Sequence, residues 1–110
     1  MSNSPYQPQD VEVIVDTPDV RVAEITLGPH ADTPPHEHTE VPEVCYCLEG
    51  QLVCEADGEA PTVLRAGQRR TFAAGSHHQL RNAGDAPCRF LLIHAGGRFD
   101  FVTAGPSTTK

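Results

Sequence analysis

Glycine and proline are scattered along the whole chain and limit its fold more than any other feature. The 110 residues include ten prolines and nine glycines, and no stretch free of both exceeds nine residues. An average globular helix runs about 11–12 residues, and an interior proline or glycine costs a helix roughly 3 or 1 kcal/mol. The sequence therefore excludes helical bundles, coiled coils and Rossmann-type folds. A membrane helix needs about 20 apolar residues, and since no run approaches that length we expect no membrane association.

Between these breaks lie short segments rich in β-branched and aliphatic residues. They recur roughly every 8–12 residues, which is typical of a β-sandwich or barrel. We therefore predict an all-β domain of about ten short strands. The turn at Glu49 and Gly50 predicts a hairpin between the strands on either side of it. The predicted strands are 11–15, 20–27, 44–48, 51–55, 62–65, 69–73, 77–81, 88–94 and 98–102.

The length and charge of the chain limit the number of its domains and the kinds of partner that it can bind. We expect a single domain over residues 10–103, flanked by loose segments at 1–9 and 104–110. The formal net charge is −7, which argues against nucleic-acid binding. The first ten residues have neither the basic nor the apolar region of a signal peptide, so we expect a cytoplasmic protein. In that compartment its four cysteines are expected to remain thiols.

The histidines carry the clearest chemical signal. Among the six in the chain, His36 and His38 form a His-x-His triplet. On an extended backbone, residues two apart project to the same side, so both imidazoles can bind one metal ion. Pro42 predicts a turn or bulge that brings Glu43 back beside them. Two imidazoles and a carboxylate suit iron and its neighbours. The sequence therefore predicts a divalent-metal site.

Two spaced patterns resemble the two motifs of the cupin superfamily. The first reads Gly28, His36-Glu37-His38, four residues, Glu43, six residues, Gly50. The second reads Gly67, five residues, Ala73-Ala74-Gly75, two residues, His78, three residues, Asn82. The chain departs from the family at two places: seven residues rather than five separate Gly28 from His36, and Ala73 stands where the family has proline. Neither departure falls on a ligand position of the family.

The resemblance implies a double-stranded β-helix, the small antiparallel jelly-roll barrel of a single-domain (monocupin) metal-binding protein. It implies one divalent metal ion (Fe, Mn, Zn or Ni) inside the barrel, held by His36, His38, Glu43 and His78. That ligand set leaves coordination positions open, as a catalytic metal requires. Small cupins are commonly dimers, so the resemblance also implies a homodimer. The predicted strand at 11–15 is a natural edge for pairing across its interface.

Three functions are compatible with these features. The favoured one is a metal-dependent enzyme of the Fe(II) oxygenase type, acting on a small polar molecule. The first alternative is a Lewis-acid isomerase or epimerase on a sugar-like compound, with His94 or a loop residue moving the proton. The second alternative is a cupin that binds a small ligand without turnover. The fold hosts many unrelated chemistries, so the resemblance does not choose among these functions.

Several further residues have either a structural or a functional interpretation. His94 shares a strand face with Phe90 and Leu92. It could act as an acid or base in the pocket, but the simpler interpretation is a histidine at a strand end whose hydrogen bonds are satisfied. Cys45 and Cys47 share the parity of Glu43, so they are expected inside the barrel as small apolar groups, with a role at the metal as the alternative.

The remaining candidates are polar residues near predicted turns and strand ends. His77 is expected to face outward, and Asn82 is expected to shape the turn after its strand. His30 is a candidate for the mouth of the pocket. An inward-facing arginine could clamp a substrate carboxylate, and the candidates for this role are Arg65, Arg70 and Arg81.

Overall fold

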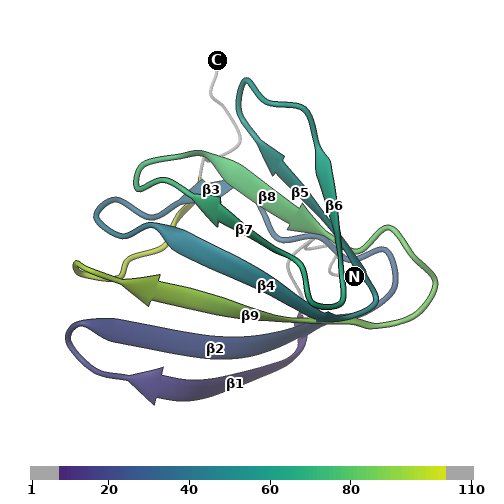
Figure 1. The fold of residues 1–110 in the computed structure, drawn as a ribbon, viewed down its shortest axis with the longest axis horizontal. Helices are drawn as coiled ribbons and strands as arrows, with labels where there is room; N and C mark the ends of the chain where they lie inside the picture. The colour runs from purple at the N-terminus through teal and green to yellow at the C-terminus, as the bar shows by residue number, and fades with distance from the viewer. Residues whose placement is uncertain (1–7, 104–110) are drawn as a thin grey trace, which may run out of the picture.

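The computed structural model describes residues 8–103, and every regular element in this range is a β-strand. The strands form two sheets of five, with antiparallel pairing throughout, which confirms the predicted all-β fold (Figure 1). No helix able to cross a membrane occurs in this part of the chain. The strands are β1 (Pro8–Asp16), β2 (Val20–Leu27), β3 (His36–Glu37), β4 (Glu43–Glu49), β5 (Gln51–Ala56), β6 (Thr62–Arg65), β7 (Arg69–Phe72), β8 (His78–Arg81), β9 (Cys88–Ala95) and β10 (Val102–Thr103).

The two sheets form the layers of a jelly-roll sandwich. Their strand orders are β1-β2-β9-β4-β7 and β10-β3-β8-β5-β6, so β4 and β5 belong to different sheets (Figure 1). The predicted hairpin between these strands is therefore wrong. Both edges of β4 are occupied by β7 and β9, and the chain crosses to the second sheet at Gly50, whose φ is +85°. Only glycine adopts that conformation without strain.

Most predicted strands match the structure within one or two residues, and the exceptions lie near the ends of the chain. Residues 98–101 are not strand, and pairing begins only at β10, whose Val102 and Thr103 lie opposite β3. The short strand β3 was not predicted, because two residues are too few to show an alternating pattern. β1 begins at Pro8, inside the segment predicted as the N-terminal tail. The predicted loose segments otherwise lie outside the described residues.

Alternation along the strands places the core between the two sheets. In β9 the buried side chains are Cys88, Phe90, Leu92 and His94, and the residues between them are partly exposed. This row is apolar from Cys88 to Leu92 and ends in the polar His94. The neighbouring strand β4 runs antiparallel to β9 and places Glu43 opposite His94, so both strands are polar at the same end. The interior therefore has an apolar body and a polar end, and the candidate site lies at the polar end.

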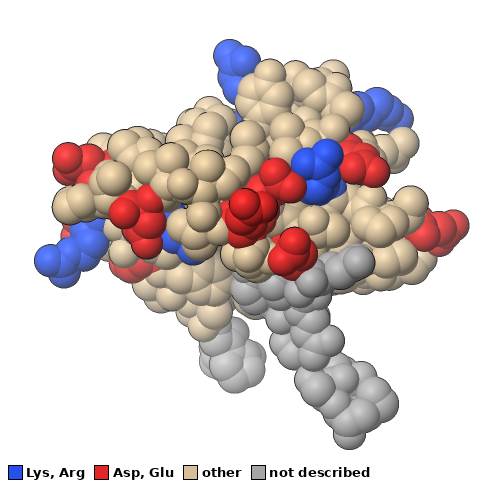
Figure 2. All heavy atoms as spheres, turned by 90° about the horizontal axis from the view of Figure 1, so that it is seen from below, with Lys and Arg blue, Asp and Glu red and all other residues tan. Residues whose placement is uncertain are grey.

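Charged side chains of both signs are interspersed on the face shown in Figure 2. Independently of that view, Arg89 forms ion pairs with Glu24 at 3.0 Å and with Glu49 at 3.2 Å. Exposed pairs of this kind contribute roughly 0–1 kcal/mol each. The fold therefore depends mainly on its apolar core, with Leu27, Leu52 and other fully buried side chains.

Candidate metal centre

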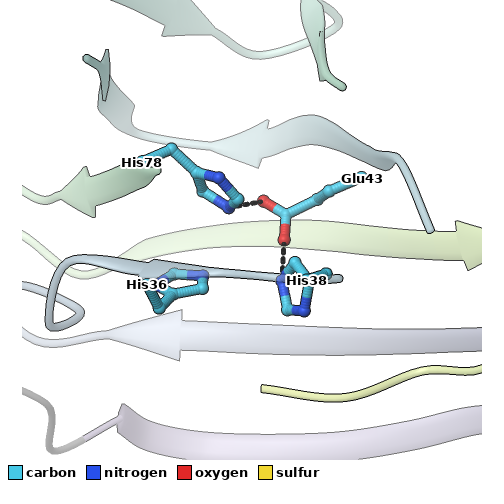
Figure 3. A group of neighbouring side chains, drawn as sticks. All are labelled: His36, His38, Glu43 and His78. Carbon is cyan, nitrogen blue, oxygen red and sulfur yellow. Dashed lines mark hydrogen bonds and ion pairs between the residues drawn. The ribbon is translucent and has the colours of Figure 1, made fainter. Parts of the chain in front are cut away.

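Four residues with metal-binding side chains meet at the polar end of the barrel. His36 lies on β3 and pairs with His78 of β8, His38 follows two residues later, and Glu43 begins β4 (Figure 3). One potential ligand atom from each residue lies within 4.8 Å of every other. All four side chains are buried, with at most 3% of any residue exposed. The chain bends at Thr39 and Glu40 rather than at Pro42, where the sequence predicted a turn or bulge, and Glu43 lies beside the histidines.

Each histidine of this cluster is oriented by a backbone carbonyl. The Nδ1 atoms lie 2.7 Å from the Pro34 oxygen for His36, 2.5 Å from the Asp100 oxygen for His38, and 2.9 Å from the Ser76 oxygen for His78. An Nδ1–H that donates to a carbonyl fixes the ring and leaves Nε2 to bind a metal. Three separate loops therefore aim three Nε2 atoms at the same region.

The atoms facing this region include polar groups without hydrogen-bond partners. Glu43 Oε2 and His78 Nε2 are buried and make no hydrogen bond, although they lie 3.4 Å apart. An unsatisfied buried polar group costs roughly 1–3 kcal/mol, so native structures rarely retain one unless it has a role. A divalent ion ligated by these atoms would satisfy both groups. The donor set of three imidazoles and one carboxylate also suits iron, manganese, zinc or nickel.

The electrostatics of the cluster prepare these groups for a cation. Burial lowers the pKa of His36 to about 4, so its imidazole is neutral and able to ligate at pH 7. Burial alone would raise the pKa of Glu43, but the surrounding imidazoles of His38, His78 and His94 outweigh it and hold that pKa well below its usual range. The carboxylate is therefore ionised. Burial opposes a charge on His38 as well, but its contacts with Glu43 and the Asp100 carbonyl raise its pKa.

His38 has an acceptor near each of its ring nitrogens. Its Nδ1 lies 2.5 Å from the Asp100 oxygen and its Nε2 lies 2.9 Å from Glu43 Oε1, so both ring nitrogens face acceptors. Only the doubly protonated imidazolium donates in both directions. A metal ion held at Nε2 would take the place of that proton, so metal binding would be coupled to proton release.

His94 adds a fourth imidazole to the site. It lies on β9, its Nε2 is 2.9 Å from Glu43 Oε1, and its buried Nδ1 has no hydrogen-bond partner. The simpler sequence interpretation, a satisfied histidine at a strand end, is therefore incomplete. The side chain contacts the carboxylate of a candidate ligand and lines the adjacent cavity.

A cavity of about 240 Å³ opens beside the cluster. Its walls include the imidazoles of His36, His38 and His94 together with Leu92, and two aromatic rings, Phe99 and Phe101, border it. The ring of Phe101 stacks on His36 at 4.4 Å between centroids, and Phe99 lies 4.8 Å from His94.

The segment that carries these two aromatic rings also carries Asp100. The Asp100 carboxylate accepts a hydrogen bond from the Thr39 amide at 2.7 Å, and its backbone oxygen lies 2.5 Å from His38 Nδ1. Asp100 therefore connects the cavity wall to the orientation of a candidate ligand.

Sequence reasoning missed the arginine and the aromatic rings that line this cavity. Arg21 is the arginine in the wall, and it shares strand parity with the buried Ala23 and Ile25 of β2, so the alternation alone could have placed it inside. Phe99 and Phe101 left no such signal, because they lie in a segment without regular pairing.

The arginines proposed from sequence as carboxylate clamps lie elsewhere. Arg70 pairs with Glu59 at 2.5 Å, and Arg81 forms an ion pair with Glu55. Arg65 is exposed on β6. None of these three arginines lines the cavity beside the cluster.

The other predicted residues divide between the surface and the core. His77 faces outward as expected, 3.2 Å from Glu37, and the exposed His30 pairs with Asp85 at 2.8 Å rather than lining the cavity. Cys45 and Cys47 are fully buried inside the barrel, and all four cysteines are free thiols. Burial and contact with other thiols raise the pKa of Cys88 to about 12, so this group stays protonated and apolar.

Known proteins share this arrangement of strands. A sequence model described as "Cupin domain" matches residues 23–94. Germin-like protein subfamily 2 member 2 from Arabidopsis thaliana is 31% identical over 81 residues, which are 70% of this chain and 37% of that protein. The match therefore spans little more than a third of the relative's length.

Solved structures extend the likeness over nearly the whole chain. An uncharacterized conserved protein with a double-stranded β-helix domain from Klebsiella pneumoniae subsp. pneumoniae MGH 78578 is 24% identical with a TM-score of 0.80, covering 96% of this chain and 89% of that one. DMSP lyase DddQ from Ruegeria pomeroyi DSS-3 is 17% identical with a TM-score of 0.79, covering 90% and 53%. At these identities the two structures share the fold alone with this chain.

Proposed function

This chain belongs to the cupin family, and from that premise we propose that it is a metal-dependent enzyme of the Fe(II) oxygenase type. The observation that carries the proposal is the convergence of His36, His38, Glu43 and His78 beside an open cavity. Buried atoms of Glu43 and His78 there make no hydrogen bond among the described residues. When bound, a divalent ion supplies Lewis-acid activation of a substrate oxygen, and iron(II) also supplies redox chemistry with dioxygen.

The protein's own groups prepare this site for a small molecule. The carbonyl contacts at Nδ1 hold the imidazoles in place before any ligand enters, so little reorganisation is required. Phe99 and Leu92 line the cavity and limit the water next to the cluster, which strengthens polar interactions inside it. β4 lies between β7 and β9, and His94 of β9 contacts the carboxylate of Glu43 from its own side of β4.

Oxygen consumption tests the oxygenase proposal. The protein is loaded anaerobically with Fe(II), its iron content is measured, and oxygen uptake is followed with a panel of phenols, diketones and thiols. We expect substrate-dependent uptake that is lost in Glu43→Gln and retained in His77→Gln, a matched change of a neighbouring outward-facing histidine. Bound iron without uptake for any member of the panel would contradict the oxygenase assignment.

The unpartnered Nδ1 of His94 favours a second candidate, Lewis-acid isomerisation or epimerisation of a sugar-like compound. This nitrogen is buried, and it belongs to a side chain that lines the cavity, so a ligand that reaches it could exchange a proton with it. For protein loaded with manganese, zinc or nickel, His94→Gln should then abolish turnover of an aldose or ketose while the metal content stays normal. Turnover that survives in this variant would exclude His94 as the proton-transfer group.

We also propose that the protein is a homodimer formed through β1. This strand is at the edge of its sheet and exposes apolar side chains, with Val13 45% and Ile14 53% exposed. An exposed apolar edge strand is a natural site for pairing with another chain. Light scattering should give twice the chain mass of 11.9 kDa. We expect Ile14→Lys to yield monomers and Val63→Lys, on the edge of the other sheet, to remain dimeric. A wild-type monomer at micromolar concentration would refute the proposal.

A further inference from the structure

Arg21 lies next to the candidate metal centre, and the proposed reaction assigns it no role. It lies on the inner face of β2, directly opposite His94 of β9 and opposite Asp16 of β1. Its guanidinium carbon lies 4.5 Å from the centre of the Phe99 ring, and the side chain lines the cavity beside the cluster. The Arg21 side chain therefore packs against the ring of Phe99. Its cross-strand neighbour His94 contacts Glu43.

The charge of Arg21 has no counter-ion among residues 8–103. Arg70, Arg81 and Arg89 each form an ion pair with a glutamate, but Arg21 makes no ion pair within 4 Å, not even with the facing carboxylate of Asp16. Its residue is half-buried, and removing a cation from water without a paired anion is costly. The stacking on Phe99 offsets part of that cost, since the face of an aromatic ring attracts a cation.

Apart from Thr33, the rest of the cavity wall is apolar or contributed by imidazoles. Ile25, Leu80 and Leu92 line it with the two phenylalanines, and Arg21 is the single arginine or lysine of its lining. The volume of about 240 Å³ corresponds to roughly eight water molecules at about 30 Å³ each. A ligand that fits this space is small and largely apolar, and it needs one anionic group to pair with the guanidinium.

We propose that Arg21 is a specificity-determining residue that pairs with the carboxylate of a small substrate, whose apolar body lies against Phe99 and Leu92. The planar guanidinium presents paired N–H donors that match a carboxylate, and the ring of Phe99 fixes its plane before the ligand arrives. This role replaces the one expected from sequence for Arg65, Arg70 and Arg81. The inference rests on the proposed function only in assigning the far end of the substrate to the metal centre.

Binding of benzoate and of its neutral analogue benzamide to the metal-free protein tests the pairing without any catalysis. Isothermal titration calorimetry should show that the wild type prefers benzoate over benzamide by at least roughly tenfold. A hydrogen bond to a charged group contributes about 1.5–3 kcal/mol, so Arg21→Gln should weaken benzoate binding roughly 10- to 100-fold and leave benzamide unchanged. Arg21→Lys, which keeps the charge but not the paired donors, should fall between them and serves if the glutamine variant does not fold.

Two controls separate this role from structural ones. Arg81→Gln removes an arginine that is paired with Glu55 outside the cavity, and it should leave benzoate binding unchanged. If Arg21 merely balanced the facing charge of Asp16, Asp16→Asn would alter thermal stability as much as Arg21→Gln does, and neither variant would change the preference for benzoate. Equal affinity of the wild type for both probes, or a benzoate preference that survives in Arg21→Gln, would overturn the proposal.

The same titration with Zn(II) present distinguishes this inference from the proposed function. If the protein binds no metal but retains an Arg21-dependent preference for benzoate, the metal-enzyme proposal fails and the carboxylate site stands. If metal binds normally but the preference is absent, the carboxylate site fails and the metal centre stands.

Discussion

Replacing Asn82 by alanine should destabilise the protein strongly, because this side chain connects the end of β2 with the turn that precedes β9. The residue is 1% exposed, and its Nδ2 lies 3.1, 3.0 and 2.8 Å from the carbonyl oxygens of Leu27, Gly28 and Ala86. Its Oδ1 accepts the Gly84 amide at 3.0 Å. An amide group has only two hydrogens to donate, so the four contacts amount to about three full hydrogen bonds.

The expected loss follows from these contacts. Each hydrogen bond contributes about 1 kcal/mol net, and carbonyls left buried without a partner add a further penalty. We therefore expect Asn82→Ala to lower the free energy of unfolding by about 3–5 kcal/mol and the melting temperature by roughly 10–20 °C. Asn82→Asp keeps the shape but points carboxylate oxygens at carbonyl oxygens, so it should be at least as unstable at pH 7.

Urea denaturation of the metal-free protein, followed by circular dichroism, measures these losses. Gln68→Ala is a matched control, because the Gln68 side-chain oxygen accepts the Arg65 amide at 2.8 Å in an exposed setting where water can replace it. That control should cost less than about 1 kcal/mol. If Asn82→Ala costs no more than Gln68→Ala, the reasoning about buried hydrogen bonds at this turn is refuted.

Three other features give independent predictions. Gly50→Ala should lower the free energy of unfolding by at least about 1 kcal/mol more than Gly58→Ala does. Both glycines have positive φ, but only at position 50 would the new Cβ lie 3.2 Å from the Cys88 Cα. Equal losses of stability in urea denaturation would contradict this prediction. With its pKa raised to about 12 by burial and neighbouring thiols, Cys88 should resist a disulfide reagent at pH 8 until the protein unfolds, and rapid labelling of native protein would show that the thiol is accessible. Because the unfolded thiol ionises near pH 8.5 and the folded one does not, the contribution of Cys88 to the free energy of unfolding should be constant below that pH and should decrease above it. Asp100→Ala should weaken metal binding roughly 10- to 100-fold, because the Asp100 carboxylate anchors the segment whose carbonyl orients His38. Competition with a chelator measures the affinity, and an unchanged affinity would refute this role.

Local sequence patterns predicted the strands and the ligand set but not the connections between strands. The alternation of Cys88, Phe90, Leu92 and His94 correctly placed one row of side chains inside. The turn at Gly50 indicated a reversal, but a turn does not determine whether the next strand pairs with the previous one or crosses to the facing sheet. That choice depends on which edges distant strands already occupy, and β4 is flanked by β7 and β9.

The candidate site divides in the same way between local and long-range features. The spacing of His36, His38, Glu43 and His78 resembles the cupin motifs, so these four could be named in advance, and the structure brings them together. The proposed role of Arg21 depends on its distance from Phe99, 78 positions further along the chain, and on the absence of a counter-ion among residues 8–103. Neither fact is contained in a short segment of sequence.

Metal stoichiometry tests the central claim most directly. The purified protein is stripped with a chelator, incubated with Fe(II) or Zn(II), separated from free ions and analysed for metal by mass spectrometry. The account predicts one ion per chain for the wild type and for His77→Ala, and almost none for His78→Ala or Glu43→Gln, with all variants folded by circular dichroism. A wild type that binds no ion, or a Glu43→Gln, His78→Ala double variant that binds as much metal as the wild type, would contradict the assignment of these residues as a metal centre.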